Sequence, residues 1–237
     1  MLSRRDFLAY FGGLTVASAA VAALPEALRG QGWWSAAYAD EADIVLDTYN
    51  GLAAMLWPGD DAYSVAQGEW NDRPGAIAAN AGHHLVVALD GLVPPPSVPL
   101  GSKHSVPLSG AVASAINTVA LEVNPAAVAG SFPSPFARLA FADKAAVWRT
   151  LEEDTRRVSE RDPTHSLGVL QFVFGVLPAF VQFFAFSEID VFDPATRILV
   201  RRPVGWDHCG YLGTSLEPVE GWDDFQGYYQ DRREVEG

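Results

Sequence analysis

Cysteine is nearly absent from this chain, with one among 237 residues. A single thiol cannot close a disulfide within the chain, and it cannot build a thiolate zinc site or a c-type haem attachment. Basic residues are also scarce, with 16 Lys and Arg against 29 Asp and Glu, for a formal net charge of −13. Because nucleic-acid binding needs clustered positive charge, this composition argues against nucleic acid as a partner.

The motifs of several common catalytic folds are missing as well. The sequence has no glycine-rich dinucleotide loop, no P-loop, no G-x-S-x-G elbow and no H-E-x-x-H zinc motif. Hydrophobic residues make up 49% of the chain, which argues against disorder. The sequence therefore indicates a folded protein without a familiar catalytic signature.

The N-terminus is typical of an export signal. A charged start, an apolar stretch and a small-residue cleavage site follow one another over residues 1–39, and the start resembles the twin-arginine (Tat) motif. The residues concerned are Arg4, Arg5, Phe7 and Leu8 in the motif, and Ala37 and Ala39 at the cut. We expect export through Tat to the periplasm or another extracytoplasmic compartment. The alternative is an N-terminal membrane anchor or a chance pair of arginines.

Residues 40–237 are expected to form one domain that consists mainly of helices. Apolar residues recur at spacings of three and four over 42–56, 77–92 and 108–123, which predicts three amphipathic helices. A fourth is predicted to begin with Ser134 as N-cap and Pro135 at the first helical position. Its polar face is predicted to carry Lys144, Arg149, Glu152 and Glu153.

Residues 167–186 stand apart, with 20 uncharged residues that include six phenylalanines. This length could span a bilayer, but Gln171, Pro178 and Gln182 interrupt it, which favours a buried central helix. After it, residues 189–200 indicate a short hairpin, and no helical period follows Arg202. The fold class is therefore all-α, an irregular bundle of about five helices with an aromatic, loop-rich C-terminal tail.

Three polar pairs are candidate sites, and each has a structural alternative. Asp60-Asp61 could bind calcium or act as acid and base, but more simply form a turn and a helix cap. His83-His84 form a poor ligand pair on a helix, where a core histidine is the simpler interpretation. His208-Cys209 is the most reactive-looking pair, and we expect Cys209 to be a buried or partner-facing thiol or a link to another chain.

Four short motifs together resemble the gluconate 2-dehydrogenase subunit 3 family. They are the Tat motif at Ser3–Leu8, L-W-P-G-D at residues 56–60, R-P-G-A at residues 73–76, and G-W-D-H-C-G-Y-L-G at residues 205–213. In the last, Leu212 stands where the family usually has proline.

The resemblance implies a helical small subunit that binds no cofactor itself. It implies a large partner of the glucose-methanol-choline (GMC) oxidoreductase type that carries FAD and oxidises a sugar or an alcohol, often with a membrane-attached cytochrome c that contains haem c. The small subunit would escort the folded partner through Tat export and stabilise it. The residues that we expect at the partner interface are Trp206, Cys209, Gly210, Tyr211, Trp222, Phe183 and Phe184.

The alternative is a standalone exported enzyme or binding protein. Its site would lie near Asp207 and His208, or near Asp60 and Asp61.

Overall fold

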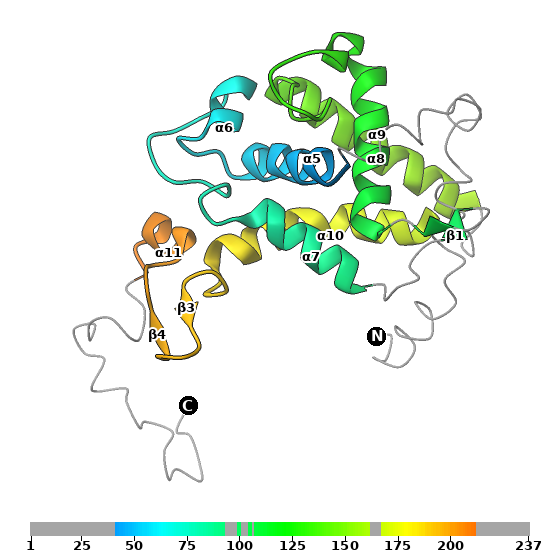
Figure 1. Ribbon diagram of the computed structural model, residues 1–237. Helices are drawn as coiled ribbons and strands as arrows, with labels where there is room; N and C mark the ends of the chain where they lie inside the picture. Colours follow the sequence, from blue (N-terminus) through cyan, green and yellow to red (C-terminus); the bar gives the residue numbers. More distant parts are fainter. Residues whose placement is uncertain (1–40, 93–98, 101–103, 106, 162–166, 212–237) are drawn as a thin grey trace, which may run out of the picture. The chain divides into compact units, whose positions relative to one another are not determined.

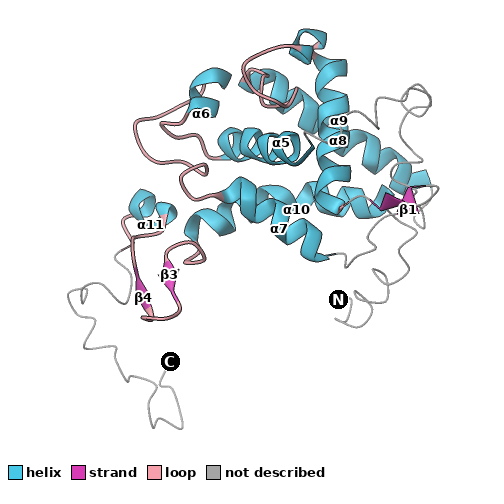
Figure 2. Cartoon of the chain, viewed as in Figure 1, coloured by secondary structure: helices cyan, strands magenta, loops and turns pink. Residues whose placement is uncertain are grey.

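A computed structural model describes residues 41–92, 99–100, 104–105, 107–161 and 167–211. The described residues are mostly helical, with seven α-helices, one 3₁₀-helix and two two-stranded sheets (Figures 1 and 2). The predicted all-α class is confirmed. Contacts divide the chain into two compact units, residues 1–185 and 186–237, whereas the sequence predicts a single domain after the signal.

The first unit holds most of the helices. Its elements are α5 (Glu41–Leu56), α6 (Ala62–Gln67), α7 (Ala81–Leu92), β1 (Pro99–Leu100), β2 (His104–Ser105), α8 (Leu108–Val123), η1 (Pro125–Val128), α9 (Phe141–Arg161) and α10 (Leu167–Phe186). Helix α5 packs against α7 and α8, and α8 packs against α9. The strands β1 and β2 pair antiparallel, with Pro99 opposite Ser105.

The predicted helices at 108–123 and 167–186 match α8 and α10, and α5 begins one residue before its predicted start. Helix α7 begins later than predicted, at Ala81 and not near Ile77. Asn80 has a φ of 54°, in the left-handed region, and Ala81 N donates to Ala76 O at 3.1 Å. A right-handed helix cannot run through that backbone conformation, so a separate turn precedes α7.

The predicted start of the fourth helix is wrong. Ser134 Oγ does accept from Ala137 N at 3.1 Å, but the turn closes there, and α9 begins at Phe141. Phe136 N donates to Asn117 Oδ1 of α8, and Arg138 donates to four backbone carbonyls. These tertiary hydrogen bonds hold the segment as an isolated turn. The four carbonyls belong to Ala127, Val128, Phe132 and Pro133.

Helix α10 contributes one of its faces to the core of the first unit. Val173, Phe174, Leu177 and Val181 are buried there, and the Phe174 ring meets Trp148 of α9 edge-on at 5.7 Å. This agrees with a core helix. Among the described helices, none is long and apolar enough to cross a membrane.

The second unit contains the predicted hairpin and a helix that the sequence analysis missed. Strands β3 (Phe192–Asp193) and β4 (Ile198–Leu199) pair antiparallel, and α11 (Val204–Cys209) follows. The expectation of no helix after Arg202 is therefore wrong, because six residues are too few to show a helical period. The predicted tail residues 212–237 lie outside the described residues.

Candidate interaction surface

The second unit exposes many large apolar side chains for its size. Within 26 described residues, five large apolar side chains beyond α10 are exposed: Ile189, Phe192, Ile198, Val200 and Tyr211. Val200 has the highest exposed fraction, 69%. Concentrated apolar exposure of this kind marks binding surfaces more often than scattered single residues do. We refer to these five residues as the hairpin surface.

The geometry of β4 explains why two of these side chains, Ile198 and Val200, face solvent. Leu199 points inward and packs with Val191 and Trp206 in a small core. Because successive side chains of a strand alternate between faces, Ile198 and Val200 on either side of Leu199 point outward.

The turn of the hairpin is held by a carboxylate. Asp193 accepts hydrogen bonds from the Thr196 hydroxyl at 2.7 Å and from Ala195 N at 2.9 Å. These bonds lower the pKa of Asp193, with the Thr196 hydroxyl contributing most. Arg197 completes the turn with a φ of 60°. The turn therefore presents β4 in a defined register.

The G-W-D-H-C-G-Y motif forms α11 and its C-terminal cap. Gly205 lies against Phe186, where an added Cβ would be 2.6 Å from the ring. Trp206 is buried and its Nε1 donates to Phe186 O at 3.0 Å. Gly210 caps the helix with a φ of 69°. Each of these residues therefore has a structural role.

The predicted interface residues of this motif divide into two groups. Cys209, Gly210 and Tyr211 are exposed, whereas the Trp206 side chain belongs to the core. The expectation that Trp206 contacts a partner needs correction, because its ring is only 8% exposed. Tyr211 meets Trp206 edge-on at 4.8 Å and is the aromatic ring of the motif that faces solvent.

The alternative site at Asp207 and His208 is organised by an arginine. Arg202 Nε lies 2.6 Å from Asp207 Oδ1, and its Nη2 donates to Tyr211 O. The Asp207 carboxylate therefore orients Arg202 across the end of α11. This ion pair gives Asp207 a structural explanation.

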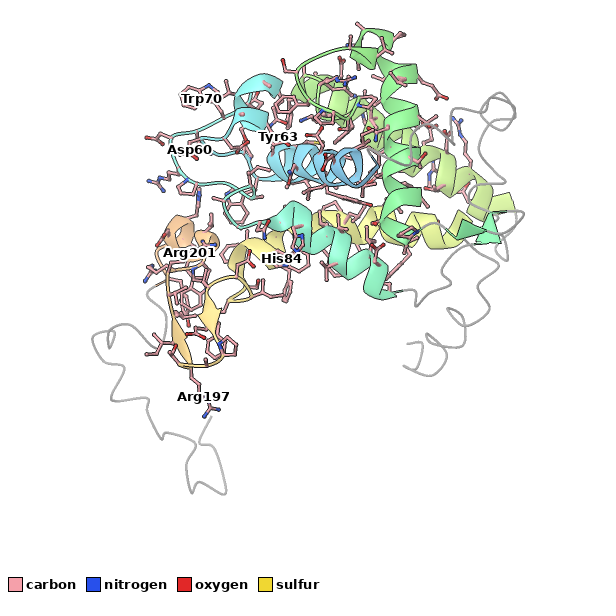
Figure 3. The ribbon with its side chains drawn as sticks, in the orientation of Figure 1. Asp60, Tyr63, Trp70, His84, Arg197 and Arg201 are labelled. Carbon is pink, nitrogen blue, oxygen red and sulfur yellow. The ribbon has the colours of Figure 1, made fainter. Side chains whose placement is uncertain are left out.

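Two neighbouring phenylalanines of α10 take opposite positions. Phe183 is 60% exposed, whereas Phe184 is buried and its ring lies 5.2 Å from His84. The expectation of Phe184 at a partner interface needs correction, because its side chain belongs to the core. His84, which Figure 3 shows on α7, is half-buried, so the histidine that was expected in the core lies at its edge, beside Phe184.

Asp60 and Asp61 adopt the structural alternative. Asp61 is the N-cap of α6, and its carboxylate accepts from Ser64 N at 2.9 Å and from Ser64 Oγ at 2.8 Å. Asp60 is exposed, and its backbone N donates to Arg73 O at 3.1 Å. Within the described residues, no group of three or more His, Cys, Asp or Glu could hold a metal ion.

The two motifs at residues 56–60 and 73–76 lie against each other. Ala76 N donates to Trp57 O at 3.0 Å, and Asp60 N to Arg73 O. Between these bonds Gly59 and Gly75 touch, and a Cβ on Gly59 would lie 2.2 Å from Gly75 N. We call this pairing the glycine clasp. Only glycine fits at such a close approach of two backbones.

Lys144 is a buried lysine that the helical pattern of the sequence does not reveal. Lys144 was expected on the polar face of its helix, but it is fully buried. Its Nζ donates to Gln67 Oε1 at 2.8 Å and to Gly51 O at 3.2 Å. Burial lowers the pKa of Lys144 to about 8, although the charges of Asp61 and Asp47 raise it.

A buried carboxylate joins α5 to α6 nearby. Asp47 accepts from Tyr63 OH at 2.6 Å and from Ser134 N at 2.8 Å. Burial, then the hydrogen bond to Asp47, raises the pKa of Tyr63 to about 12. Figure 3 shows Tyr63 on α6 facing α5. Apolar periodicity gives no signal for this network, because its polar groups interrupt the helix stripes.

Several predicted site residues lie outside the described residues. They are Arg4, Arg5, Phe7 and Leu8 of the Tat motif, Ala37 and Ala39 of the cleavage site, and Trp222 of the tail.

Comparison with protein-family models, with curated proteins and with solved structures gave no match. The resemblance to the gluconate 2-dehydrogenase subunit 3 family therefore depends on the four short motifs alone.

Proposed function

We propose that this chain is a non-catalytic small subunit of an exported, membrane-associated dehydrogenase. Its partner would be a GMC-type large subunit that carries FAD and oxidises a sugar or an alcohol. The small subunit would escort that folded partner through Tat export and stabilise it. The observation that carries the proposal is the hairpin surface, where five large apolar side chains face solvent in a small unit.

The polar side chains add support. Asp61 caps a helix, Asp207 pairs with Arg202, and Asp47 holds Tyr63 and a backbone amide. Each of these carboxylates has a structural partner in the described residues, which supports a scaffold that presents a surface. The motif-based resemblance and the N-terminal Tat motif point to the same role.

The test is co-expression of the full chain with a GMC-type flavin dehydrogenase of the same organism that lacks its own export signal, followed by capture of the tagged dehydrogenase. We expect the wild-type chain to co-purify with it. Ile198→Ser combined with Val200→Ser should reduce the captured chain by at least about tenfold, because burying an Ile or Val side chain contributes roughly 1.5–3 kcal/mol. Val128→Ser is the matched control, since Val128 is 70% exposed but lies on η1 in the first unit.

Two results would contradict the proposal. The first is a wild-type chain that does not co-purify with the dehydrogenase. The second is a chain that, purified alone, shows flavin absorbance or oxidises a sugar or an alcohol.

A further inference from the structure

Trp70 is an exposed tryptophan on an ordered loop, far along the sequence from the hairpin surface. Its side chain is 61% exposed, at the point where the chain leaves α6 (Figure 3). A tryptophan ring that is exposed to water does not contribute the stabilisation that its burial would provide. Tryptophan is also the residue type most enriched among the side chains that dominate binding energy.

Hydrogen bonds on both sides fix the backbone that carries Trp70. Asn71 N donates to Gly59 O at 3.2 Å, and Asn71 Nδ2 donates to Pro58 O at 2.6 Å. Asn71 Oδ1 in turn accepts from Arg73 N at 2.8 Å. The residue after Trp70 is therefore tied to the glycine clasp at the end of α5.

The residue before Trp70 is tied to the protein interior. Gln67 Nε2 donates to Glu69 O at 3.2 Å and to Ala54 O at 2.8 Å, while Gln67 Oε1 accepts from buried Lys144. The loop thus holds Trp70 in place before any partner arrives. Such preorganisation lowers the conformational entropy lost on binding.

Acidic side chains surround the tryptophan in sequence. Asp60, Glu69 and Asp72 are exposed, against one exposed base, Arg73. Val65 of α6 adds an exposed apolar side chain. An apolar anchor with a charged rim is the usual anatomy of a protein interface.

We propose that Trp70 and its acidic rim form a second docking site for the large subunit. The partner surface would offer an apolar pocket for the indole, bordered by Lys and Arg side chains. The acidic rim disfavours a second copy of this chain, because a two-fold contact would place like charges together. This inference rests on the proposed function, since it names the chemistry of that same partner.

The experiment measures the Kd between the full chain and the GMC-type flavin dehydrogenase used in the co-expression test. We expect Trp70→Ala to weaken binding by at least about tenfold with an unchanged circular dichroism spectrum, because the ring is exposed. Phe141→Ala is the control and should leave Kd unchanged, since Phe141 is also an exposed aromatic of the first unit.

Salt tests the chemistry of the rim. Binding by the wild-type chain should weaken as NaCl is raised from low to high concentration, and a variant with Asp60→Asn, Glu69→Gln and Asp72→Asn should show a smaller dependence. If binding by the wild-type chain does not depend on salt, the proposal that Lys and Arg side chains border the partner's pocket is wrong.

The outcomes separate this site from the proposed function. If the wild-type chain binds and Trp70→Ala binds equally well, the Trp70 site is wrong while the proposed function stands. If the wild-type chain does not bind, the proposed function fails and this site fails with it. If Trp70→Ala converts a dimer of this chain into monomers but leaves dehydrogenase binding unchanged, a second copy of the chain binds at Trp70 and the proposal is overturned.

Discussion

Lys144 shows how a single residue can differ from its sequence pattern. On a helix that carries Arg149, Glu152 and Glu153, a lysine is expected in solvent. In the fold, Gln67 and the carbonyl of Gly51 accept its hydrogen bonds, and the ring of Phe136 lies 5.6 Å from Nζ. These partners offset part of the cost of burying a charge.

The lowered pKa of Lys144 predicts a distinctive pH dependence of stability. In the unfolded chain the amine titrates near 10.5, and in the folded chain near 8. Below pH 8 the amine is charged in both states, and its burial destabilises the fold in full. Between pH 8 and 10.5 the unfolded chain binds more protons than the folded chain, so the free energy of unfolding rises with pH. We expect the free energy of unfolding to rise by about 1–2 kcal/mol between pH 7.5 and 9.5.

Urea unfolding of the wild-type chain and of Lys144→Met at both pH values measures the contribution of Lys144. Above pH 10 the raised pKa values of Tyr63 and Tyr49 make the free energy of unfolding fall as pH rises, so the measurement stays below pH 10. An equal pH dependence in Lys144→Met would show that another group causes the rise.

At the scale of elements, the glycine clasp connects the end of α5 to the turn before α7. Its backbone bonds join Trp57 to Ala76 and Asp60 to Arg73, and Asn71 extends the pairing to Gly59. The motifs that carry the family resemblance in this region are therefore structural elements. They position the loop that presents Trp70.

Substitution of Gly59 tests the clasp. Gly59→Ala would place a Cβ 2.2 Å from Gly75 N, where only backbone can move. We expect destabilisation by roughly 1–3 kcal/mol, the usual cost of overpacking. Thermal unfolding measures this loss of stability.

Gly175→Ala on α10 is the control, because open space surrounds that position and alanine favours a helix by about 0.5–1 kcal/mol. Equal stability of Gly59→Ala and the wild-type chain would contradict the close approach.

At the scale of the whole molecule, each of the two units carries a candidate contact for a partner. The hairpin surface is in the second unit, and Trp70 is in the first. Under the proposed function, both the hairpin surface and Trp70 would contact the folded partner. The acidity of the chain, with a net charge of −13, favours a partner surface with basic character.

The proposed export role predicts the effect of replacing the paired arginines Arg4 and Arg5. When both Arg4→Lys and Arg5→Lys are introduced, we expect the partner dehydrogenase to remain in the cytoplasm, because the Tat signal is read by a receptor. Dehydrogenase activity in the periplasmic and cytoplasmic fractions measures this. Arg29→Lys is the control within the same N-terminal segment and should leave export intact. Continued appearance of the dehydrogenase outside the cytoplasm in the double variant would remove the escort role.

The parts of the fold that depend on local pattern could be predicted. Helices α5, α8 and α10 and the hairpin at Asp193 were found because apolar spacing, proline and turn residues act within a few positions. The start of α9 could not be predicted, because hydrogen bonds from Phe136 N to the Asn117 side chain and from the Arg138 side chain to Phe132 O hold the preceding turn. Helix α11 was missed because six residues show no period.

The candidate sites follow the same division. The sequence by itself determined the helical class, the acidity and the N-terminal motif, and it correctly favoured a cap for Asp61. Only the tertiary structure decided that Lys144, Phe184 and Trp206 are buried while Trp70 and Val200 are exposed. The physical reason is that periodicity reflects interactions between near neighbours in the chain. Burial depends instead on which distant segments fold over a residue.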